Sequence, residues 1–442
     1  MTAPLQISSE AHSAAQALLD YIDMSPSPWH AVATTKAMLD ANGFKPLIEN
    51  QPWQFRKNGK YYVVRDGSSL IAFIIGDKPI AETGFRIVGA HTDSPGLRLK
   101  PKAGFASQGH AQLGVEVYGG PILATFTDRD LSLAGRVMVR NNDGLHSHLI
   151  RFKTPMVRLP NLAIHMNREA NDKGLVLNKQ TGLPLIFGFA SDSAEAHNLL
   201  TQALATQIEA DAKDIAKDIV SWDLNVYDTQ QGVLWGLNQE FIANSQLDNL
   251  ASCHAAIEAL LATNKPEGTT ICALFDHEEV GSESATGASG SFMTDVMTRI
   301  CASTNTSAED RLRGIANSFF ISADMAHAFH PNHAGSYEPC HHAMLNQGPV
   351  IKTNANQRYS TNAETAARFI QLCEQANVPY QQYAHRTDLG CGSTIGPILA
   401  AQLGMASVDV GNPMWAMHSI RESAGVLDHA YMIAVLKQHF CV

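Results

Sequence analysis

Acidic and imidazole side chains follow several of the apolar runs in this chain. The residues at these points are His91, Asp93, Glu278, Glu279, Asp324 and His418, and one more acid, Asp248, lies at the start of 247-LDNLASCHAAIEALLAT-263. In open α/β sheets, ligand sites form outside the carboxyl ends of the strands, where loops from separate strands converge. We therefore expect these side chains to share one site.

Imidazoles and carboxylates in this proportion favour a pair of divalent metal ions, with zinc as the leading candidate. Two cations about 3.5–4 Å apart usually share a carboxylate and leave room for a water. The adjacent pair Glu278 and Glu279 in 276-DHEEVGSES-284 fits such a site, although like charges repel. One of the two carboxylates can bind metal while the other accepts a proton from the attacking water.

Each of these elements also has an ordinary structural interpretation. A histidine and an aspartate two residues apart are often a surface or capping pair, and two glutamates after a strand often lie in a solvated loop. Asp248 alone could be a helix N-cap, and Asp324 and His418 carry no signal singly. The combination favours a dinuclear site, because all of these residues lie where predicted strands and helices meet loops.

The surrounding elements predict an α/β fold with an insertion. Helical periodicity at 8–22, 247–263 and 362–376 alternates with strand-like runs, among them 86–91 and 270–275. Between about 100 and 235 the runs are shorter and alternating, and we expect strands there, including 155–159 and 174–178. The predicted architecture is an α/β/α sandwich formed by residues 1–99 and 236–442, interrupted by a β-rich domain at 100–235.

Composition excludes several classes of protein. The formal net charge is −10, which argues against a nucleic-acid-binding surface. The N-terminus lacks a signal-peptide pattern, and no apolar stretch approaches the roughly 18 residues of a membrane span. The seven cysteines form no C-x-x-C pair, as expected of reduced thiols. We therefore expect a soluble, cytoplasmic protein.

Several longer strings resemble the aspartyl aminopeptidase family of cytosolic dinuclear zinc metallopeptidases. They are 89-GAHTDSPGLRLK-100, 127-TDRDLSLAGRV-137, 244-NSQLDNLAS-252, 276-DHEEVGSESATGA-288, 347-QGPVIKTNANQRY-359, 391-CGSTIGP-397 and 416-AMHSIRES-423. The matches run in order across nearly the whole chain. The resemblance implies a zinc-peptidase-like catalytic domain whose β-rich insertion serves dimerisation.

The resemblance also implies metal ligands and a base. His91 and Asp324 would bind the first zinc, Glu279 and His418 the second, and Asp248 both. Asp93 would orient the imidazole of His91, and Glu278 would be the general base and later the proton donor. The Asp248–Asn249 peptide bond is expected to be cis, and Co²⁺ or Mn²⁺ could substitute for Zn²⁺.

Three further residues resemble substrate contacts of the family. Tyr359 would donate to the developing oxyanion, and Lys352 would attract an acidic N-terminal side chain. His165, in the inserted domain, would contribute to the site of a neighbouring subunit. Two of these residues also have an ordinary interpretation: Lys352 as a solvated lysine at a strand end, and His165 as an interior histidine with its hydrogen bonds satisfied. The segments 121-PILATF-126 and 383-YAHRTDLGCG-392 depart from the family pattern, which bears on the substrate pocket.

The predicted activity is that of a metalloaminopeptidase, a hydrolase that removes the N-terminal residue of short peptides, with a preference for Asp or Glu. Dimers that assemble to a dodecamer are expected from the family. Two alternatives stay open at this point: a related dinuclear amidohydrolase, such as a deacylase or carboxypeptidase, and an inactive scaffold of the same fold.

Overall fold

A computed structural model describes residues 6–208 and 215–441. Its contacts divide the chain into two compact units. The first unit comprises residues 1–93, 232–417 and 422–442, and the second comprises 94–231 and 418–421. These boundaries lie a few residues before the predicted positions 100 and 235, and the segment 418–421 is counted with the second unit rather than the first.

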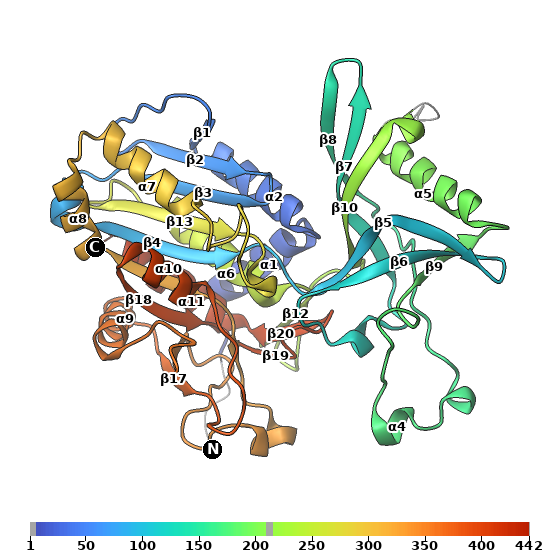
Figure 1. Cartoon of the computed structure of the whole chain (residues 1–442). Helices are drawn as coiled ribbons and strands as arrows, with labels where there is room; N and C mark the ends of the chain where they lie inside the picture. The colour runs from blue at the N-terminus through green and yellow to red at the C-terminus, as the bar shows by residue number, and fades with distance from the viewer. Residues whose placement is uncertain (1–5, 209–214, 442) are drawn as a thin grey trace. The chain divides into compact units, whose positions relative to one another are not determined.

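Within the described residues, the first unit is built on a nine-stranded sheet (Figure 1). The order of its strands is β1 (Lys45–Leu47), β2 (Lys60–Arg65), β3 (Ser69–Ile74), β13 (Thr269–Phe275), β4 (Phe85–His91), β14 (Phe319–Ala323), β18 (Ala406–Gly411), β16 (Val350–Thr353) and β17 (Gln381–Ala384). The four strands β13, β4, β14 and β18 run parallel to one another. Their carboxyl ends therefore lie at one edge of the sheet.

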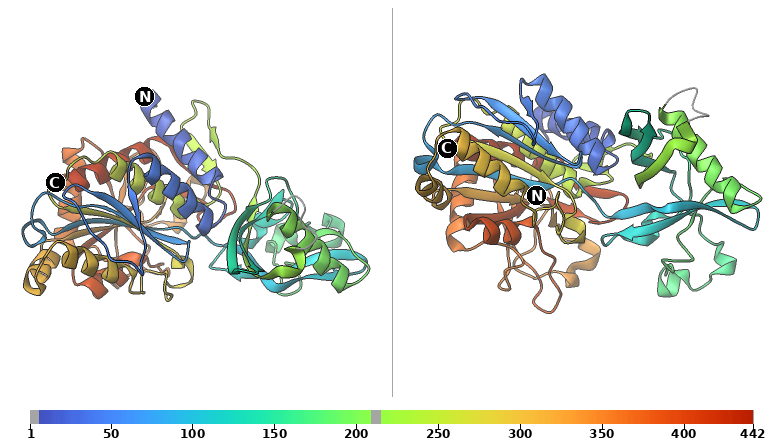
Figure 2. Two further views of the ribbon diagram at one scale, coloured as in Figure 1. Left: turned by 90° about the horizontal axis from the view of Figure 1, so that it is seen from above. Right: turned by 45° about the horizontal axis from the view of Figure 1, so that its top comes forward.

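Helices cover both faces of this sheet (Figures 1 and 2). One layer contains α1 (Ser9–Asp23), α2 (Pro28–Ala41), α6 (Leu247–Leu261), α9 (Ala363–Gln375) and α11 (Val426–Cys441). The other contains α3 (Ile80–Thr83), α7 (Phe292–Ser303), α8 (Ala308–Ala316) and α10 (Ile395–Leu403). Along β3, Ala72 and Ile74 face the first layer and Ile71 and Phe73 the second. The predicted α/β/α sandwich is confirmed.

A smaller five-stranded sheet of the first unit carries the segments that enter and leave the proposed site. Its order is β11 (Val233–Trp235), β12 (Phe241–Asn244), β20 (Glu422–Gly425), β19 (Pro413–Trp415) and β15 (Ala326–His327). Strand β12 leads into α6, and β15 follows Asp324. The last helix, α11, begins at Val426, because the preceding residues 422–425 pair with β12 and β19.

The second unit is β-rich, with one antiparallel sheet in its described residues. The order is β8 (Gly144–Arg151), β7 (Leu131–Asn141), β10 (Ile219–Asp228), β5 (Gly96–Ser107), β6 (His110–Tyr118) and β9 (Leu185–Phe189). Helix α5 (Ser193–Ile208) packs on this sheet, where Leu200 and Leu204 join a core that includes Leu97 and Leu133. Short helical turns lie at η1 (Leu123–Phe126), η2 (Ile164–Met166), α4 (Ala170–Lys173) and η3 (Ile215–Asp218).

Two predicted strands of this unit are wrong. Residues 155–159 form only isolated bridges, Val157 with Leu131 and Arg158 with Ile186. Pro155 begins this run and Pro160 follows it, and a proline cannot donate to a strand ladder. Residues 174–178 adopt no strand either. A short apolar run is thus a weak strand signal where no partner strand lies alongside.

The state of the cysteines and the apolar character of the helices can both be read from the structure. All seven cysteines are free thiols, and four of them are buried. Across the residues that the structure describes, the helices lack the combination of length and apolar character that crossing a membrane requires.

Gly411, at the end of β18, allows β18 to pass directly beside Asp324, the residue that follows β14. A Cβ atom at Gly411 would lie 1.7 Å from the carbonyl oxygen of Asp324. Because that neighbour is backbone and cannot rotate away, we expect Gly411→Ala to lower the free energy of unfolding by roughly 1–3 kcal/mol. Thermal unfolding measures the effect. Gly390→Ala is the control, since a Cβ there meets nothing within 4 Å; equal midpoints for the two variants would contradict the expectation.

Candidate metal centre

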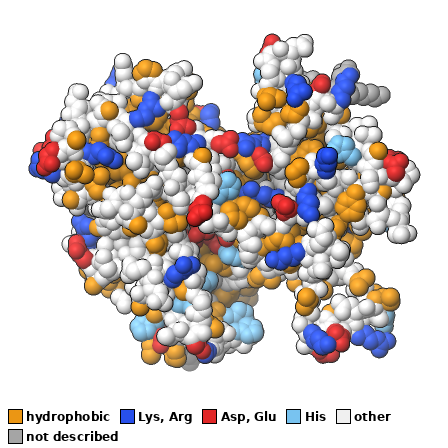
Figure 3. Space-filling model, in the orientation of Figure 1, with side chains coloured by type: hydrophobic (Ala, Val, Ile, Leu, Met, Phe, Trp, Pro, Cys, Tyr) orange, Lys and Arg blue, Asp and Glu red, His pale blue; other side chains and the backbone are white. Residues whose placement is uncertain are grey.

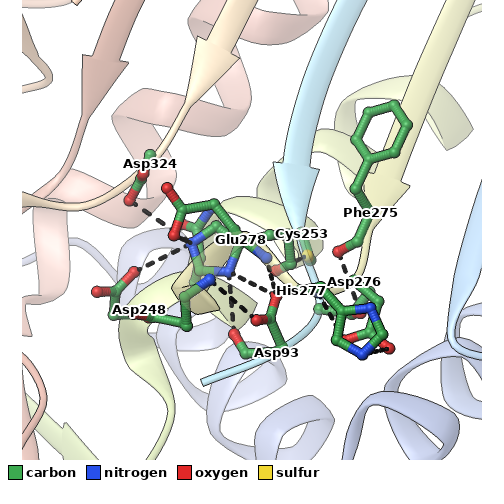
Figure 4. Close-up of polar contacts among 12 residues, drawn as sticks. Asp93, Asp248, Cys253, Phe275, Asp276, His277, Glu278 and Asp324 are labelled. Carbon is green, nitrogen blue, oxygen red and sulfur yellow. Dashed lines mark hydrogen bonds and ion pairs between the residues drawn. The ribbon is translucent and has the colours of Figure 1, made fainter. Parts of the chain in front are cut away.

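The parallel register brings the predicted acidic residues to one edge of the large sheet. In the β4–β13 pair, His91 lies opposite Phe275, so the segment that begins at Asp276 starts at the level of His91. Strand β14 lies on the other side of β4 and delivers Asp324 to the same edge. Asp248 comes from the start of α6, which packs against β4. In Figure 4 the side chains of Asp248, Glu278 and Asp324 converge.

The imidazole of His91 is the centre of this cluster. Its Nε2 atom lies 3.6 Å from Asp248 Oδ1, 3.8 Å from Asp324 Oδ1 and 4.0 Å from Glu278 Oε2. Among the described residues of the first unit, two sets of three donor atoms lie within 4.8 Å of one another: His91, Asp248 and Asp324 in one, and His91, Glu278 and Glu279 in the other. Donor atoms this close together can coordinate one ion.

Asp93 contacts both sides of the cluster. Its backbone oxygen lies 2.9 Å from His91 Nδ1, and its Oδ1 atom lies 3.4 Å from the same nitrogen. Its two carboxyl oxygens accept the backbone N–H groups of Glu278 and Glu279, both at 3.1 Å. With Nδ1 held in this way, Nε2 faces the carboxylates, which is the arrangement that metal-binding histidines adopt. Asp93 thus also holds the two glutamates in place.

The start of α6 has an unusual backbone. The Asp248–Asn249 peptide bond is cis, as expected from the sequence resemblance. The backbone N–H of Asp248 donates to Glu422 Oε2 at 3.0 Å, and the side-chain amide of Asn249 donates to the carbonyl of Ala323 at 2.8 Å. Asp248 is therefore tied to β20 and to the end of β14. Glu422 was not among the predicted site residues, although it lies in the quoted string 416–423.

The cluster is strongly negative, and the pKa values reflect this. Burial raises the pKa of Glu278 to about 8; the charge of His91 opposes this shift, and repulsion from Asp324, Asp93 and Asp248 adds to it. Burial and the carboxyl group of Asp248 raise the pKa of Glu279 well above its usual range. Burial alone would lower the pKa of His91, but the nearby carboxylates of Asp324 and Asp93 outweigh this effect and raise that pKa.

These observations test whether the residues fit divalent cations. Oxygen and imidazole donors are the right types for zinc. The raised pKa values of Glu278 and Glu279 show that a carboxylate charge is costly here, and a nearby cation would remove that cost. The donor set therefore fits a metal centre.

Lys352 and Tyr359 adjoin the cluster on the side of Asp324. Lys352 is 2% exposed, and its Nζ atom donates to the carbonyl oxygens of Asp324 at 2.9 Å and Met325 at 3.2 Å. The interpretation as a solvated lysine is therefore wrong. The ammonium group lies 5.1 Å from the ring centre of Tyr359, which is also buried. Burial and the side chain of Cys391 raise the pKa of Tyr359, so its hydroxyl stays protonated.

His418 and His165 belong to the second unit. His418 Nδ1 lies 3.1 Å from the carbonyl oxygen of Gly120, and its φ is +70°. His165 lies in η2 and is exposed, so the interpretation as a satisfied interior histidine is wrong. The predicted roles of both residues, as metal ligand and as substrate contact, stay predictions.

Sequence reasoning missed a second support for His91. The Sγ atom of Cys253, on α6, lies 3.0 Å from the backbone oxygen of His91. Burial raises the pKa of Cys253 to about 12, so it acts as a thiol donor. Its position in the apolar run of a helix gave no signal of this contact.

Other histidines gather on the surface of the first unit around η5 (Pro331–Ser336), as Figure 3 shows in pale blue. They include His333 and His341, which are exposed. Within the described residues, the three-donor groups able to hold a metal do not include any of them. These surface histidines are therefore separate from the candidate metal centre.

Comparison with known proteins agrees with this geometry. The family model for aminopeptidase I zinc metalloproteases (M18) matches residues 21–440. The probable M18 family aminopeptidase 2 of Ectopseudomonas mendocina (strain ymp) is 48% identical over 423 residues, which are 95% of this chain and 96% of that protein.

Two solved structures extend the similarity to the fold. A chain of the cryo-EM structure of the Ape4 and Nbr1 complex has a TM-score of 0.93 at 39% identity and covers 99% of this chain and 87% of that one. The S. cerevesiae mApe1 dodecamer has a TM-score of 0.82 at 27% identity, with 96% of each chain covered. A family match over nearly the whole sequence shows that this chain belongs to the M18 aminopeptidases, which are zinc metallopeptidases.

Proposed function

We propose that this aminopeptidase uses two zinc ions to remove acidic N-terminal residues from short peptides, with Glu278 as the general base. The observation that carries the proposal is the double contact of Asp93. Because its carboxyl oxygens hold the backbone N–H groups of Glu278 and Glu279, both glutamates are fixed beside His91. Adjacent glutamates held in this way can take separate roles, one as ligand and one as base.

The ligand assignment follows from the donor groups. His91, Asp248 and Asp324 would hold one zinc, and Asp248 would also hold the second with Glu279 and His418. The close grouping of His91, Asp248 and Asp324 supports the first set. For the second, His418 is joined through Met417 and Ser419 to β19 and β20 of the first unit, and the backbone N–H of Asp248 donates to Glu422, the first residue of β20. Co²⁺ or Mn²⁺ would suit the same donors.

Zinc, when bound, would polarise the scissile carbonyl and lower the pKa of a water. The protein supplies the proton transfers. Glu278 accepts a proton from the water as its oxygen attacks the carbonyl carbon, and donates that proton to the amine as the C–N bond breaks. Burial of Glu278 suits the second step, since it favours the protonated acid that donates.

Tyr359 and Lys352 would contact the substrate. The Tyr359 hydroxyl, kept protonated by burial, can donate to the oxyanion that develops on the carbonyl. Lysine has three N–H donors, and Lys352 uses two of them on backbone carbonyls. Its third donor and its charge would receive the acidic side chain of the N-terminal residue.

Assembly and location complete the proposal. The S. cerevesiae relative is a dodecamer, and we propose a homo-oligomer of dimers for this chain as well. His165 is exposed on the second unit and could reach the site of a neighbouring subunit. The free thiols agree with a reducing cytoplasm. Family membership favours an aminopeptidase over the deacylase or carboxypeptidase alternatives, and turnover of any peptide would eliminate the inactive scaffold.

Glu278→Gln tests the base. The amide keeps the shape of the side chain but cannot accept the proton, so we expect kcat to fall by about 10²–10⁴ while zinc content is unchanged. Steady-state kinetics on an Asp-peptide and elemental analysis measure the two quantities. Glu283→Gln, at an exposed position of the same loop, is the control. Near-normal turnover by Glu278→Gln would show that another group is the base.

Lys352→Met tests the acidic preference. Methionine keeps the apolar stem and removes the charge, so kcat/KM should fall by about tenfold or more for Asp-peptides and much less for Leu-peptides, since one buried charge interaction exceeds about 1.4 kcal/mol. Zinc content shows whether Asp324, whose backbone Lys352 contacts, is still in place. Equal losses on both peptides with zinc retained would remove Lys352 from the specificity pocket.

A further inference from the structure

Asp409 is a buried acid that the proposed reaction does not use. It lies on β18 and is 0% exposed. In the ion pairs of the described residues, Asp409 has no Lys, Arg or His partner. A buried carboxyl group without a cation must be satisfied by hydrogen bonds, and the identity of its donors indicates what Asp409 does.

The first donors come from the loop that carries Tyr359. This loop connects β16 to α9. The backbone N–H and the hydroxyl of Ser360 both donate to Asp409 Oδ2, at 2.6 and 2.7 Å. The backbone N–H of Asp409 donates to Thr361 Oγ1 at 2.9 Å. Ser360, the residue next to Tyr359, is therefore fixed to the central sheet by two hydrogen bonds, and Thr361 by a third.

The remaining donor comes from the loop between β17 and α10. The hydroxyl of Thr394, the N-cap of α10, donates to Asp409 Oδ1. The first turn of α10 approaches closely, because a Cβ at Gly396 would lie 2.3 Å from Asp409 Oδ2. The start of a helix is favourable for a negative charge, so α10 stabilises the carboxylate as well.

The two loops that Asp409 joins also meet at Tyr359. Two hydrogen bonds join them: Arg358 Nε donates to the carbonyl oxygen of Cys391 at 3.3 Å, and the hydroxyl of Ser393 donates to the carbonyl oxygen of Arg358 at 3.0 Å. The side chain of Cys391 contacts the Tyr359 hydroxyl. One carboxyl group thus anchors the loop that holds the phenol and the loop against which the phenol rests.

We propose that Asp409 is a positioning residue for the reaction: it fixes Ser360 and Thr394, and through them sets the place of the Tyr359 hydroxyl beside the metal centre. The inference rests on the proposed role of Tyr359 as the oxyanion donor. An error of about 1 Å in such a donor is costly, because the hydrogen bond acts on charge that exists only in the transition state.

A double-mutant cycle on the zinc-loaded enzyme tests this. Tyr359→Phe should lower kcat by about 10²–10³, the usual cost of one oxyanion donor. Asp409→Asn, which turns one acceptor into a donor, should lower kcat by about tenfold or more with a smaller change in KM. If Asp409 acts through Tyr359, then Asp409→Asn should change kcat less than about threefold when phenylalanine is already present at 359.

The matched control is Asp428→Asn. Asp428 is also fully buried and accepts backbone N–H groups. Its donors, Asn346 and Gly348, precede β16 and so lie outside the loop that carries Tyr359. The fold-loss in kcat that Asp428→Asn causes should be the same with tyrosine or phenylalanine at 359, so that the losses of the two single variants multiply in the double variant. If Asp409→Asn does not fold or loses zinc, Ser360→Ala replaces it in the cycle, since it removes one donor and keeps the carboxylate. The same non-additivity is expected.

The outcomes separate the two claims. Losses from Asp409→Asn (or Ser360→Ala) that multiply fully with Tyr359→Phe would overturn the positioning role of Asp409 and leave that of Tyr359 intact. Near-normal kcat for Tyr359→Phe would overturn the oxyanion role itself, and the positioning inference with it. Unchanged kcat for both Asp409→Asn and Ser360→Ala, with Tyr359→Phe strongly impaired, would also overturn the inference.

Discussion

The rest of this structure depends on repulsion between carboxyl groups at the edge of the large sheet. Asp248, Glu278 and Asp324 all lie within 4.0 Å of one nitrogen of His91. Two unit charges 4 Å apart repel by about 4 kcal/mol even at an effective dielectric constant of 20. Proteins are stable by only about 5–15 kcal/mol in total, so a site like this must take up protons or divalent cations. The raised pKa values of Glu278 and Glu279 express the same constraint.

The fold holds these groups together through the positions of the strand ends and through hydrogen bonds to main-chain atoms. Parallel strands β4, β13 and β14 end at the same edge, and the carboxyl group of Asp93 accepts hydrogen bonds from the backbone N–H groups of Glu278 and Glu279. Around this centre, uncharged side chains donate to main-chain atoms: Cys253 to the backbone oxygen of His91, and Asn249 to that of Ala323. Lys352 adds a cation that bonds to the carbonyl of Asp324. A site built in this way is rigid before any ligand binds, which is what electrostatic catalysis requires.

Much of this could be predicted from the sequence, for a physical reason. A buried parallel strand is a continuous apolar run, so 86–90 and 270–275 stand out, and the polar residues that follow such runs must lie at the sheet edge. Contacts that depend on the course of a loop could not be predicted. Lys352, for example, donates to two backbone carbonyls whose positions no sequence pattern reveals. Asp409 looks like any polar residue in 406-ASVDV-410. The runs at 155–159 and 174–178 failed as strands because apolar character does not supply a partner strand.

Zinc stoichiometry tests the central claim most directly, namely that the carboxylate cluster exists to hold two cations with Asp248 between them. The measurement is titration of the metal-depleted protein with zinc, followed by calorimetry and elemental analysis, for the native chain and for Asp248→Asn. The account predicts two zinc ions per native chain and weakened binding of both in the variant, because both ions would share that carboxylate. A single zinc per native chain, or two zinc ions bound with undiminished affinity by Asp248→Asn, would contradict it.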